Sequence, residues 1–371
     1  MIKNLIIFGT RPEAIKMAPL VKEFQKNSNF DTRVCVTAQH REMLDQVLDF
    51  FEITPDYDLD LMKPNQNLFA LTAEIILGLK SILEDFKPDY VYVHGDTTTT
   101  MAASIAGFYS GAKICHIEAG LRTNNKYSPF PEEINRQVTG RIADYHFAPT
   151  TKSKNNLLDE NVNEVDILVT GNTVIDALFE SSERVEYIEN KEIEYLKTII
   201  LPDKKIILAT GHRRENHGKG FINICEAFRE IALNNPDTQI IYPVHLNPNV
   251  QKPVYELLSG IENVSLIEPL AYPAFVWLMN RSYLIITDSG GVQEEAPSLG
   301  KPVLVMRDTT ERPEAVDAGT VILTGTDKNK IVTECERLLN NISEYKKMAM
   351  LHNPYGDGKA CERIVEFIRN K

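Results

Sequence analysis

The sequence predicts an α/β protein made of two Rossmann-like domains, whose parallel sheets face each other across a cleft. Three observations carry this prediction. Short apolar runs alternate with helical patterns along the chain, and 371 residues are too many for one ordinary hydrophobic core. The two halves also repeat one arrangement. "NLIIFGTRPE" near the start and "KIILATGHRRE" at 205–215 are each a strand, a glycine-bearing turn and basic residues that open the next element.

Apolar runs that end in polar or glycine-bearing turns place the individual elements. Strands are predicted at 3–8, 33–37, 89–94, 113–117 and 145–148, and then at 205–209, 239–244, 264–267, 283–287 and 302–306. Helices are predicted at 12–26, 68–86, 99–110, 219–234 and 327–339. The charged stretch 183–197 has no sustained apolar face, so we place the domain junction just before it, at 169–178. The domains are then expected to span 1–170 and 171–371.

The composition disfavours several classes of protein. With 43% apolar and 25% charged residues the chain is typical of a globular protein, and its net charge of −12 disfavours a nucleic-acid surface. No apolar run has the length of a membrane span and no N-terminal leader pattern is present, so we expect a cytoplasmic protein. Five dispersed cysteines without a C-x-x-C pair, and histidines without ligand spacing, argue against disulfides and against a metal site.

The turn after the first predicted strand is a candidate anion site. Pro12 suits the first turn of a helix, and Arg11 and Lys16 bring two cations to the free N–H groups of that turn. Taken alone, the two cations fit an exposed helix start equally well.

A second candidate anion site follows strand 283–287. There Ser289, Gly290 and Gly291 offer a hydroxyl and backbone N–H groups to phosphate oxygens, and Glu295 is placed to accept from the hydroxyls of a ribose. An ordinary glycine-rich turn is the alternative. The match between the halves favours a nucleotide diphosphate. Neither the dinucleotide fingerprint G-x-G-x-x-G nor a P-loop is present.

Three acids stand at one side of the first predicted sheet. Asp96 follows strand 89–94, Glu118 follows strand 113–117, and Glu132 lies in the first turn of a helix. Each has a structural alternative, namely an N-cap for Asp96, a buried hydrogen-bonded residue for Glu118 and a helix-dipole partner for Glu132. Carboxylates packed together raise one another's pKa values, which makes some of them usable as acids near neutral pH.

The helix that carries Glu132 is predicted to begin at Pro131. Glu132 is four residues from Arg136 along this helix. Its apolar residues recur at helical spacing and are expected to form the buried stripe: Ile134, Val138 and Ile142.

His212 is the candidate for proton transfer in the second half. It follows strand 205–209 directly, where an imidazole can orient a leaving phosphate or move a proton. Up to this point the residues predict a two-domain enzyme with a nucleotide-diphosphate ligand and clustered acids, and they leave the reaction open.

A series of longer motifs resembles one known family. They are "FGTRPEAIKMAPL", "TAQHREMLDQVL", "VHGDTTTT", "HIEAGLRT", "YSPFPEEINRQ", "GNTVIDAL", "GHRREN", "YPVHLNPNV", "TDSGGVQEEAPSLGKPVL", "RDTTERPEA" and "NPYGDGKA". In this order and at this spacing, from residue 8 to about residue 360, they resemble the non-hydrolysing UDP-N-acetylglucosamine 2-epimerases.

The resemblance implies a fold and a reaction. Members of the family have the GT-B fold, with a last helix, here about 355–371, that crosses back to the first domain. They interconvert UDP-N-acetylglucosamine and UDP-N-acetylmannosamine by eliminating UDP to give 2-acetamidoglucal and adding it back, and need no cofactor. The resemblance also implies a homodimer and a role in supplying sugar nucleotides for bacterial surface polysaccharides such as capsule.

The resemblance also assigns roles to single residues. Asp96, Glu118 and Glu132 would handle protons, and the catalytic residue His212 would help to hold the diphosphate. The diphosphate would be held by Arg11 and Lys16 together with the backbone of 289–291. The remaining substrate contacts would come from the Leu270 backbone and Phe275 at the uracil, Glu295 at the ribose, and Arg312 at the sugar or phosphate.

Some members of the family bind a second UDP-N-acetylglucosamine as an activator. The residues here that are compatible with such a site are Gln39, His40, Gln66, Arg213 and His245. Glu42 and Asn65, however, stand where certain activated members carry Gln and Arg.

Three rival functions remain at this stage. A hydrolysing epimerase would release N-acetylmannosamine and UDP from the same elimination. A GT-B glycosyltransferase would share the nucleotide site but has no evident use for three acids. A catalytically silent sugar-nucleotide sensor would not need the acids and His212 together.

Overall fold

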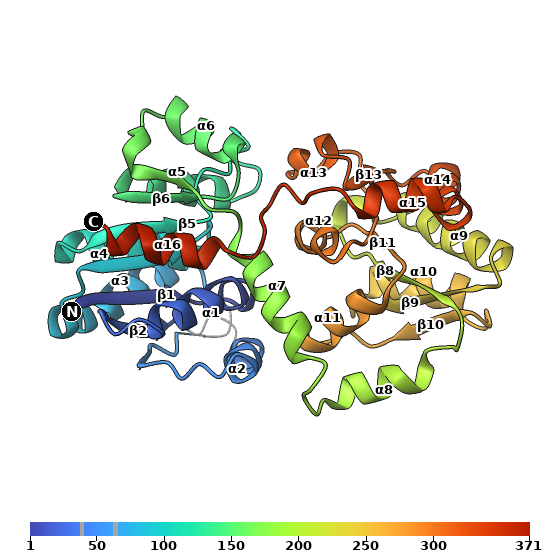
Figure 1. Cartoon of the computed structure of the whole chain (residues 1–371), viewed down its shortest axis with the longest axis horizontal. Coiled ribbons are helices and arrows are strands. Elements are labelled where there is room, and N and C mark those ends of the chain that lie inside the picture. Colours follow the sequence, from blue (N-terminus) through green and yellow to red (C-terminus); the bar gives the residue numbers. More distant parts are fainter. Residues whose placement is uncertain (38–40, 62–65) are drawn as a thin grey trace. The chain divides into compact units, whose positions relative to one another are not determined.

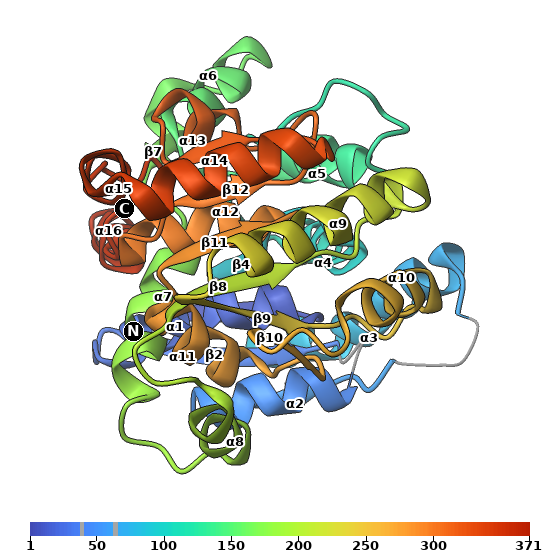
Figure 2. The same cartoon turned by 90° about the vertical axis from the view of Figure 1, so that its right-hand side faces the viewer.

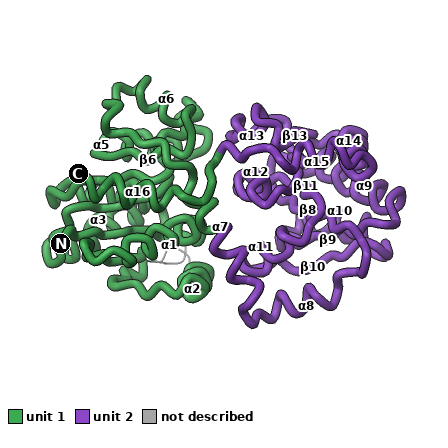
Figure 3. The backbone as a smooth tube through the Cα atoms, in the orientation of Figure 1, with its two compact units in different colours: residues 1–177, 355–371 green, residues 178–354 purple. Residues whose placement is uncertain are grey.

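The computed structural model describes residues 1–37, 41–61 and 66–371. The chain divides into two compact units (Figure 3), of which unit 1 is Met1–Ala177 with Tyr355–Lys371 and unit 2 is Leu178–Pro354. Across the described ranges, no helix is both long and apolar enough to span a membrane.

In the described part of unit 1, seven strands form one parallel sheet in the order β3-β2-β1-β4-β5-β6-β7. Figure 1 labels β1, β2, β5 and β6 of this sheet. The strands are β1 (Ile2–Phe8), β2 (Phe30–Val36), β3 (Tyr57–Asp58), β4 (Tyr90–His94), β5 (Lys113–Ile117), β6 (Tyr145–Ala148) and β7 (Ile167–Val169). This order is that of a Rossmann-like sheet, and the chain reverses direction across the sheet between β1 and β4.

The helices of unit 1 cover both faces of this sheet. They are α1 (Arg11–Gln25), α2 (Arg41–Phe50), α3 (Leu68–Phe86), α4 (Thr98–Ser110), α5 (Glu132–Ile142), α6 (Thr151–Asp159) and α16 (Ala360–Arg369), while α7 (Thr173–Arg184) leads into unit 2. Alternate residues of β4 show the two faces. Val91 and Val93 belong to the core under α3 and α4, whereas Tyr92 packs on Phe24 of α1 with ring centroids 5.0 Å apart.

Unit 2 repeats the plan, with a six-stranded parallel sheet among the described residues in the order β10-β9-β8-β11-β12-β13 (Figure 2). Its strands are β8 (Lys205–Thr210), β9 (Thr238–Pro243), β10 (Val264–Ile267), β11 (Leu284–Thr287), β12 (Val303–Val305) and β13 (Val321–Leu323). Its helices are α8 (Lys191–Ile199), α9 (Lys219–Asn234), α10 (Pro248–Leu258), α11 (Tyr272–Arg281), α12 (Gly290–Glu295), α13 (Pro313–Asp317), α14 (Lys328–Asn340) and α15 (Ile342–Ala349).

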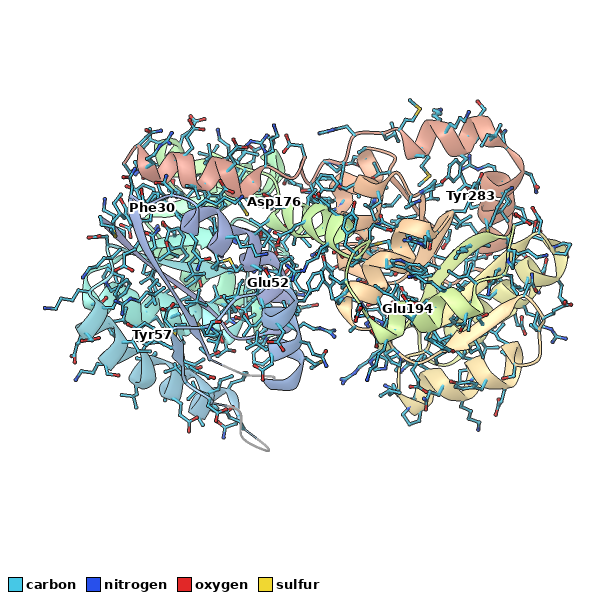
Figure 4. All side chains as sticks on the ribbon, turned by 60° about the horizontal axis from the view of Figure 1, so that its bottom comes forward. Phe30, Glu52, Tyr57, Asp176, Glu194 and Tyr283 are labelled. Atoms are coloured by element: carbon cyan, nitrogen blue, oxygen red, sulfur yellow. The ribbon has the colours of Figure 1, made fainter. Side chains whose placement is uncertain are left out.

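The C-terminal helix α16 returns to unit 1 and packs on α1. Asp176 of α7, labelled in Figure 4, accepts hydrogen bonds from the first two backbone N–H groups of α16, from Ala360 at 3.2 Å and from Cys361 at 2.9 Å. A buried carboxylate from another helix therefore caps α16, because Lys359 at its N-cap makes no side-chain cap.

The predicted fold class is confirmed, since both sheets are parallel and interleaved with helices in GT-B type units. The ten predicted strands all form, with ends shifted by at most a few residues. Three short edge strands, β3, β7 and β13, were not predicted, because two or three residues are too few to show an apolar pattern.

Candidate active site

Most of the polar side chains singled out in the sequence lie near the carboxyl ends of strands, several of them after the two strands that flank each change of strand order. In unit 1 these strands are β1 and β4, and in unit 2 they are β8 and β11. Ligands of open parallel sheets bind at such points, because the loops after the two strands run apart there. Each unit therefore presents its own cluster of candidate residues, described in turn below.

The turn after β1 is built to start α1 tightly. Thr10 caps the helix in a reciprocal capping box with Glu13, whose Oε2 accepts from the N–H groups of Thr10 and Gly9 at 2.8 and 3.1 Å. A Cβ at Gly9 would lie 2.1 Å from Thr37 Oγ1, so this position requires glycine. Arg11, half-buried at the first position of α1, has no ion pair or hydrogen bond among the described residues.

Glu118, at the end of β5, is held by groups from three distant segments. Its Oε2 forms an ion pair with Lys16 Nζ of α1. The same oxygen accepts from Asn172 Nδ2 at 2.9 Å and lies 3.5 Å from His94 Nε2. The Glu118 side chain is 11% exposed and its backbone φ is 61°, in the left-handed region that costs a non-glycine residue about 1–2 kcal/mol. Such strain persists at functional sites because the surroundings over-determine it.

The surroundings of Glu118 keep its carboxyl group ionised. Burial by itself would raise the pKa of Glu118, but Lys16 and His94 outweigh it and hold that pKa well below its usual range. Glu118 therefore enters the folded site as a carboxylate, the form that accepts a proton. Clustered acids were expected to raise one another's pKa values, and for Glu118 that expectation is wrong because Lys16 and His94 lie beside its carboxylate.

Asp96 lies in the turn after β4, beside Glu118. In the register of the two strands His94 pairs with Ile117, so Glu118 is next to Gly95, one residue from Asp96. The Asp96 carboxylate is bound by Arg136 of α5, with Nε at 2.9 Å and Nη2 at 2.7 Å from Oδ2. Asp96 is not the N-cap of α4, because that position is taken by Thr97.

The helix α5 turns a polar face inward, which corrects the predicted stripe. Ile134, Val138 and Ile142 are only partly buried, whereas Glu133 is fully buried and Arg136 is nearly so. The sequence pattern failed here because α5 packs its charged side against the β4 turn, where Arg136 bridges Asp96 and Glu133, the latter at 3.2 Å.

Glu133 completes this network, and Glu132 stays outside it. Burial would raise the pKa of Glu133, but hydrogen bonds from the N–H groups of Thr123 and Asn124 and from Gln137 lower it. Glu132 is half-buried in the first turn of α5, and Arg136, four residues on, pairs with Glu133 instead. Glu132 is therefore the less constrained acid of the set.

In unit 2 the buried Asp288 shapes the loop after β8. Its Oδ2 accepts from the backbone N–H groups of His212 and Arg213, both at 2.8 Å, and from Asn216 Nδ2 at 3.3 Å. His212 Nδ1 lies 3.6 Å from the other oxygen, Oδ1. Burial lowers the pKa of His212 and Asp288 opposes this shift, so the ring is held near its neutral form.

The N-terminus of α12 is surrounded by cations of unit 2. A Cβ at Gly290 would lie 3.5 Å from Arg312 Cζ and 3.7 Å from Arg213 Nη2, so glycine leaves both guanidinium groups access to the backbone there. Arg312 is oriented by the buried Glu294, whose Oε1 accepts from its Nε at 2.7 Å. Ser289 occupies the N-cap and makes no side-chain cap, which leaves its hydroxyl for another acceptor.

The predicted ribose and uracil contacts lie on the same side of unit 2. Glu295 is buried, and its Oε1 accepts from Tyr272 OH of α11 at 3.1 Å. Burial raises the pKa of Tyr272 well above its usual range, so this hydroxyl stays a donor. Leu270 and Phe275 flank Tyr272 in sequence and are partly buried.

The candidate activator residues fall into three groups. Gln39 and His40, together with Asn65, lie outside the described residues. Gln66 donates to Glu74 at 2.8 Å. His245 stacks on the imidazole of His212, with ring centroids 5.2 Å apart, and therefore contacts the loop that carries both His212 and Arg213.

Within the ranges that the structure describes, no cluster of three potential metal ligands occurs. All five cysteines are free and buried. The charged and titratable groups described above at the strand ends are carboxylates, guanidinium groups, an ammonium and imidazoles.

Comparison with known proteins identifies this arrangement. The family model described as UDP-N-acetylglucosamine 2-epimerase matches residues 22–369. The chain belongs to the UDP-N-acetylglucosamine 2-epimerase family. An enzyme of that name from Escherichia coli K12 is 60% identical over 370 residues, which are 99% of this chain and 98% of the relative. One from Campylobacter jejuni is 57% identical over 371 residues, 99% of this chain and 97% of the relative.

Solved structures of UDP-N-acetylglucosamine 2-epimerases agree with the family assignment. The enzyme from Neisseria meningitidis bound to UDP-GlcNAc is 55% identical, with a TM-score of 0.90 and all of both chains covered. That from Methanocaldococcus jannaschii, in complex with UDP-GlcNAc and UDP, is 35% identical, with a TM-score of 0.81 and the same coverage. The family predicted from the motifs is thereby confirmed.

Several residues that organise the site were not identified from the sequence as such. Asp288 is a strand-end acid like Asp96, so its position after β11 was an available signal. Asn172 lies in the quoted motif "GNTVIDAL", but its contact with Glu118 spans 54 positions and no local pattern indicates it. Arg136 was noted only for its four-residue spacing from Glu132, and not as a partner of Asp96.

Proposed function

We propose that this protein interconverts UDP-N-acetylglucosamine and UDP-N-acetylmannosamine by inverting C2 of the sugar, with UDP retained. The observation that carries the proposal is the pair of carboxylates, Asp96 and Glu118, at the ends of neighbouring strands of unit 1, each held by its own cation. Relatives that carry the name of this activity, and structural neighbours bound to UDP-GlcNAc and UDP, support the choice of substrate.

The proposed reaction is an elimination followed by its reverse. A carboxylate takes the C2 proton while the C1–O bond breaks, which leaves a C1–C2 double bond in 2-acetamidoglucal and frees UDP with the bonding electrons. Return of UDP to C1 and delivery of a proton to the opposite face of C2 complete the inversion. The step consumes no oxidant or reductant.

Glu118 is suited to accept the proton because it is ionised and buried. Asp96 and Glu132 are the proposed partners for the other face of C2. Arg136 holds the Asp96 carboxylate in place by two charge-assisted contacts, from Nε and from Nη2.

The nucleotide is proposed to bind unit 2 through groups of matching chemistry. Backbone N–H groups of α12, with Ser289 and Arg312, would take phosphate oxygens. Glu295 would accept from the ribose hydroxyls, and Phe275 with the Leu270 backbone would take the uracil. His212 would donate to the leaving phosphate.

The proposed cations of unit 1 are Arg11 and Lys16. Arg11 has no partner of its own among the described residues, which suits a ligand-binding cation. Lys16 is already paired with Glu118, but an ammonium group has three protons and can serve a phosphate oxygen as well.

Proton NMR of the purified protein with UDP-N-acetylglucosamine in D₂O tests the proposal. We expect UDP-N-acetylmannosamine to appear with deuterium at C2, because the intermediate is reprotonated from solvent. Lasting N-acetylmannosamine and free UDP would instead identify a hydrolysing epimerase. If UDP-N-acetylglucosamine stayed unchanged even at a saturating concentration, both the retaining and the hydrolysing epimerase would be refuted. That result would favour a glycosyltransferase that lacks its acceptor.

A further inference from the structure

The two oxygens of the Glu118 carboxylate have unequal surroundings. Oε2 receives Lys16 Nζ and Asn172 Nδ2 and faces His94 Nε2. Oε1 has no hydrogen-bond partner among the residues that the structure describes. One oxygen is thus fixed by the protein, and the other is left to a ligand.

The space beside Oε1 is kept open by a glycine. Apart from its chain neighbours His94 and Asp96, a Cβ at Gly95 would have one described atom within 4 Å, Glu118 Oε1 at 3.8 Å. Gly95 has φ of 67°, a conformation that glycine adopts without strain. The carbon atom of a substrate therefore has room at Oε1 and none at the crowded Oε2.

Asn172 is fixed so that its amide nitrogen must point to Glu118. Its Oδ1 accepts from Val174 N at 3.1 Å, and its own N–H donates to Tyr355 O at 2.7 Å. Asn172 is buried at 3% exposure, which leaves its amide no solvent alternative. Rotating the amide by 180° would set its oxygen against the carboxylate and lose the bond from Val174.

We propose that Asn172 is a positioning residue which, by donating to Oε2, presents Oε1 of Glu118 as the oxygen that exchanges a proton with C2 of the substrate. This inference rests on the proposed function. Lys16 contributes to the same orientation, but it carries charge to any bound phosphate as well. Asn172 is the neutral donor whose contact with Glu118 does not depend on the ligand.

The turn that carries Asn172 is held by the C-terminal segment of the chain. Gly171, with φ of 88°, packs on Gly356, and a Cβ there would lie 3.2 Å from Gly356 Cα. Arg363 of α16 donates to Thr170 O at 2.8 Å. The position of Asn172 is thus set by residues far apart in sequence, on the return of the chain to unit 1.

Two variants test the role of Asn172. N172A removes the donor. N172D is the matched variant, since it keeps the oxygen that accepts from Val174 and replaces only the donor with a second carboxylate facing Oε2. N235A is the control, because Asn235 is a buried asparagine of unit 2 that donates to Ile231 O at 2.8 Å, away from the acids.

The readouts are kcat, KM for UDP-N-acetylglucosamine, and the midpoint of the acid-side limb when kcat is plotted against pH. We expect N172A to lose about 10- to 100-fold in kcat with KM within about threefold. We expect the acid-side midpoint to rise by about one pH unit in N172A and further in N172D, because Glu118 loses a donor and then gains a like charge while Lys16 and His94 stay in place. N235A should lower the melting temperature, but its kcat and KM should stay within about twofold of the wild type and its acid-side midpoint should not move.

Two results would overturn the proposal. One is a kcat within twofold of wild type in both variants. The other is a loss of kcat that follows the melting temperature, with the acid-side midpoint unchanged, which would make Asn172 merely structural. A wild-type protein that does not epimerise the substrate would be a different failure, that of the proposed function itself.

Discussion

Arg136 binds a single oxygen of Asp96, Oδ2, with two of its nitrogens, and reaches Glu133 with a third. Arg136 is 8% exposed and Glu133 is fully buried. One guanidinium group therefore pairs with two carboxylates, of which only Asp96 reaches the candidate active site. This relationship ties the stability of α5 to the geometry of the proposed proton-handling group.

Replacing Arg136 by Met should destabilise the protein. The change leaves Glu133 buried without its cation, and breaking a buried ion pair in this way costs about 3–5 kcal/mol in the free energy of unfolding. Urea unfolding of the full chain, followed by circular dichroism, measures the loss. The matched control is Lys197→Met, whose partner Glu194 is exposed, and which should cost less than about 1 kcal/mol. Equal losses in the two variants would contradict the prediction.

Each of the three acids should be needed for turnover. In Asp96→Asn, Glu118→Gln and Glu132→Gln, kcat should fall by about 10² or more, because each carboxylate is proposed to handle a proton. Affinity for UDP, measured by calorimetry, should change far less. Glu164→Gln, at an exposed acid paired with Lys154, should keep wild-type turnover. Near-normal turnover in all three acid variants would show that the site is assigned wrongly.

Tyr272 should support nucleotide binding through Glu295. In Tyr272→Phe the carboxylate loses its 3.1 Å hydrogen bond, so the dissociation constant for UDP should rise about three- to tenfold. Tyr283→Phe removes a hydroxyl elsewhere in unit 2, which donates to Leu338 O at 3.5 Å, and should leave UDP binding as it is. An unchanged dissociation constant in Tyr272→Phe would argue that Glu295 does not contact the ribose.

His116 should make the stability of the protein depend on pH. Burial lowers the pKa of this imidazole from 6.5 to about 3, so the folded state takes up the proton at a lower pH than the unfolded state does. Stability from this group is therefore fully present above pH 6.5 and is lost as the pH falls from 6.5 toward 3, by about 1.4 kcal/mol per pH unit.

His116→Gln should flatten that slope. Urea unfolding at several pH values between 4.5 and 8 compares the variant with the wild type and with His352→Asn, at an exposed histidine. The control should retain the wild-type slope. If the His116 variant retained it as well, protonation of other groups would account for the acid sensitivity.

The sequence determined the features of this protein that depend on neighbouring residues. The alternation of apolar runs and helical patterns predicted the parallel α/β fold, and the strand ends placed Asp96, Glu118 and the 289–291 turn. These predictions succeeded because a strand end, a glycine-bearing turn and a helix start are each encoded within about ten residues. The motif series extended the prediction to the family.

Only the tertiary structure decided which side chains meet. Glu118 is bound by residues 102 and 54 positions away, and whether its pKa rises or falls depends on those partners. The stripe predicted for α5 was wrong, because helical periodicity tells which residues share a face but not whether that face meets an apolar core or the charged turn after β4. The return of α16 to unit 1 likewise depends on Asp176, which accepts a hydrogen bond from the N–H group of Ala360, 184 positions further along the chain. Local patterns set the elements, and long-range contacts set the charges and geometry of the site.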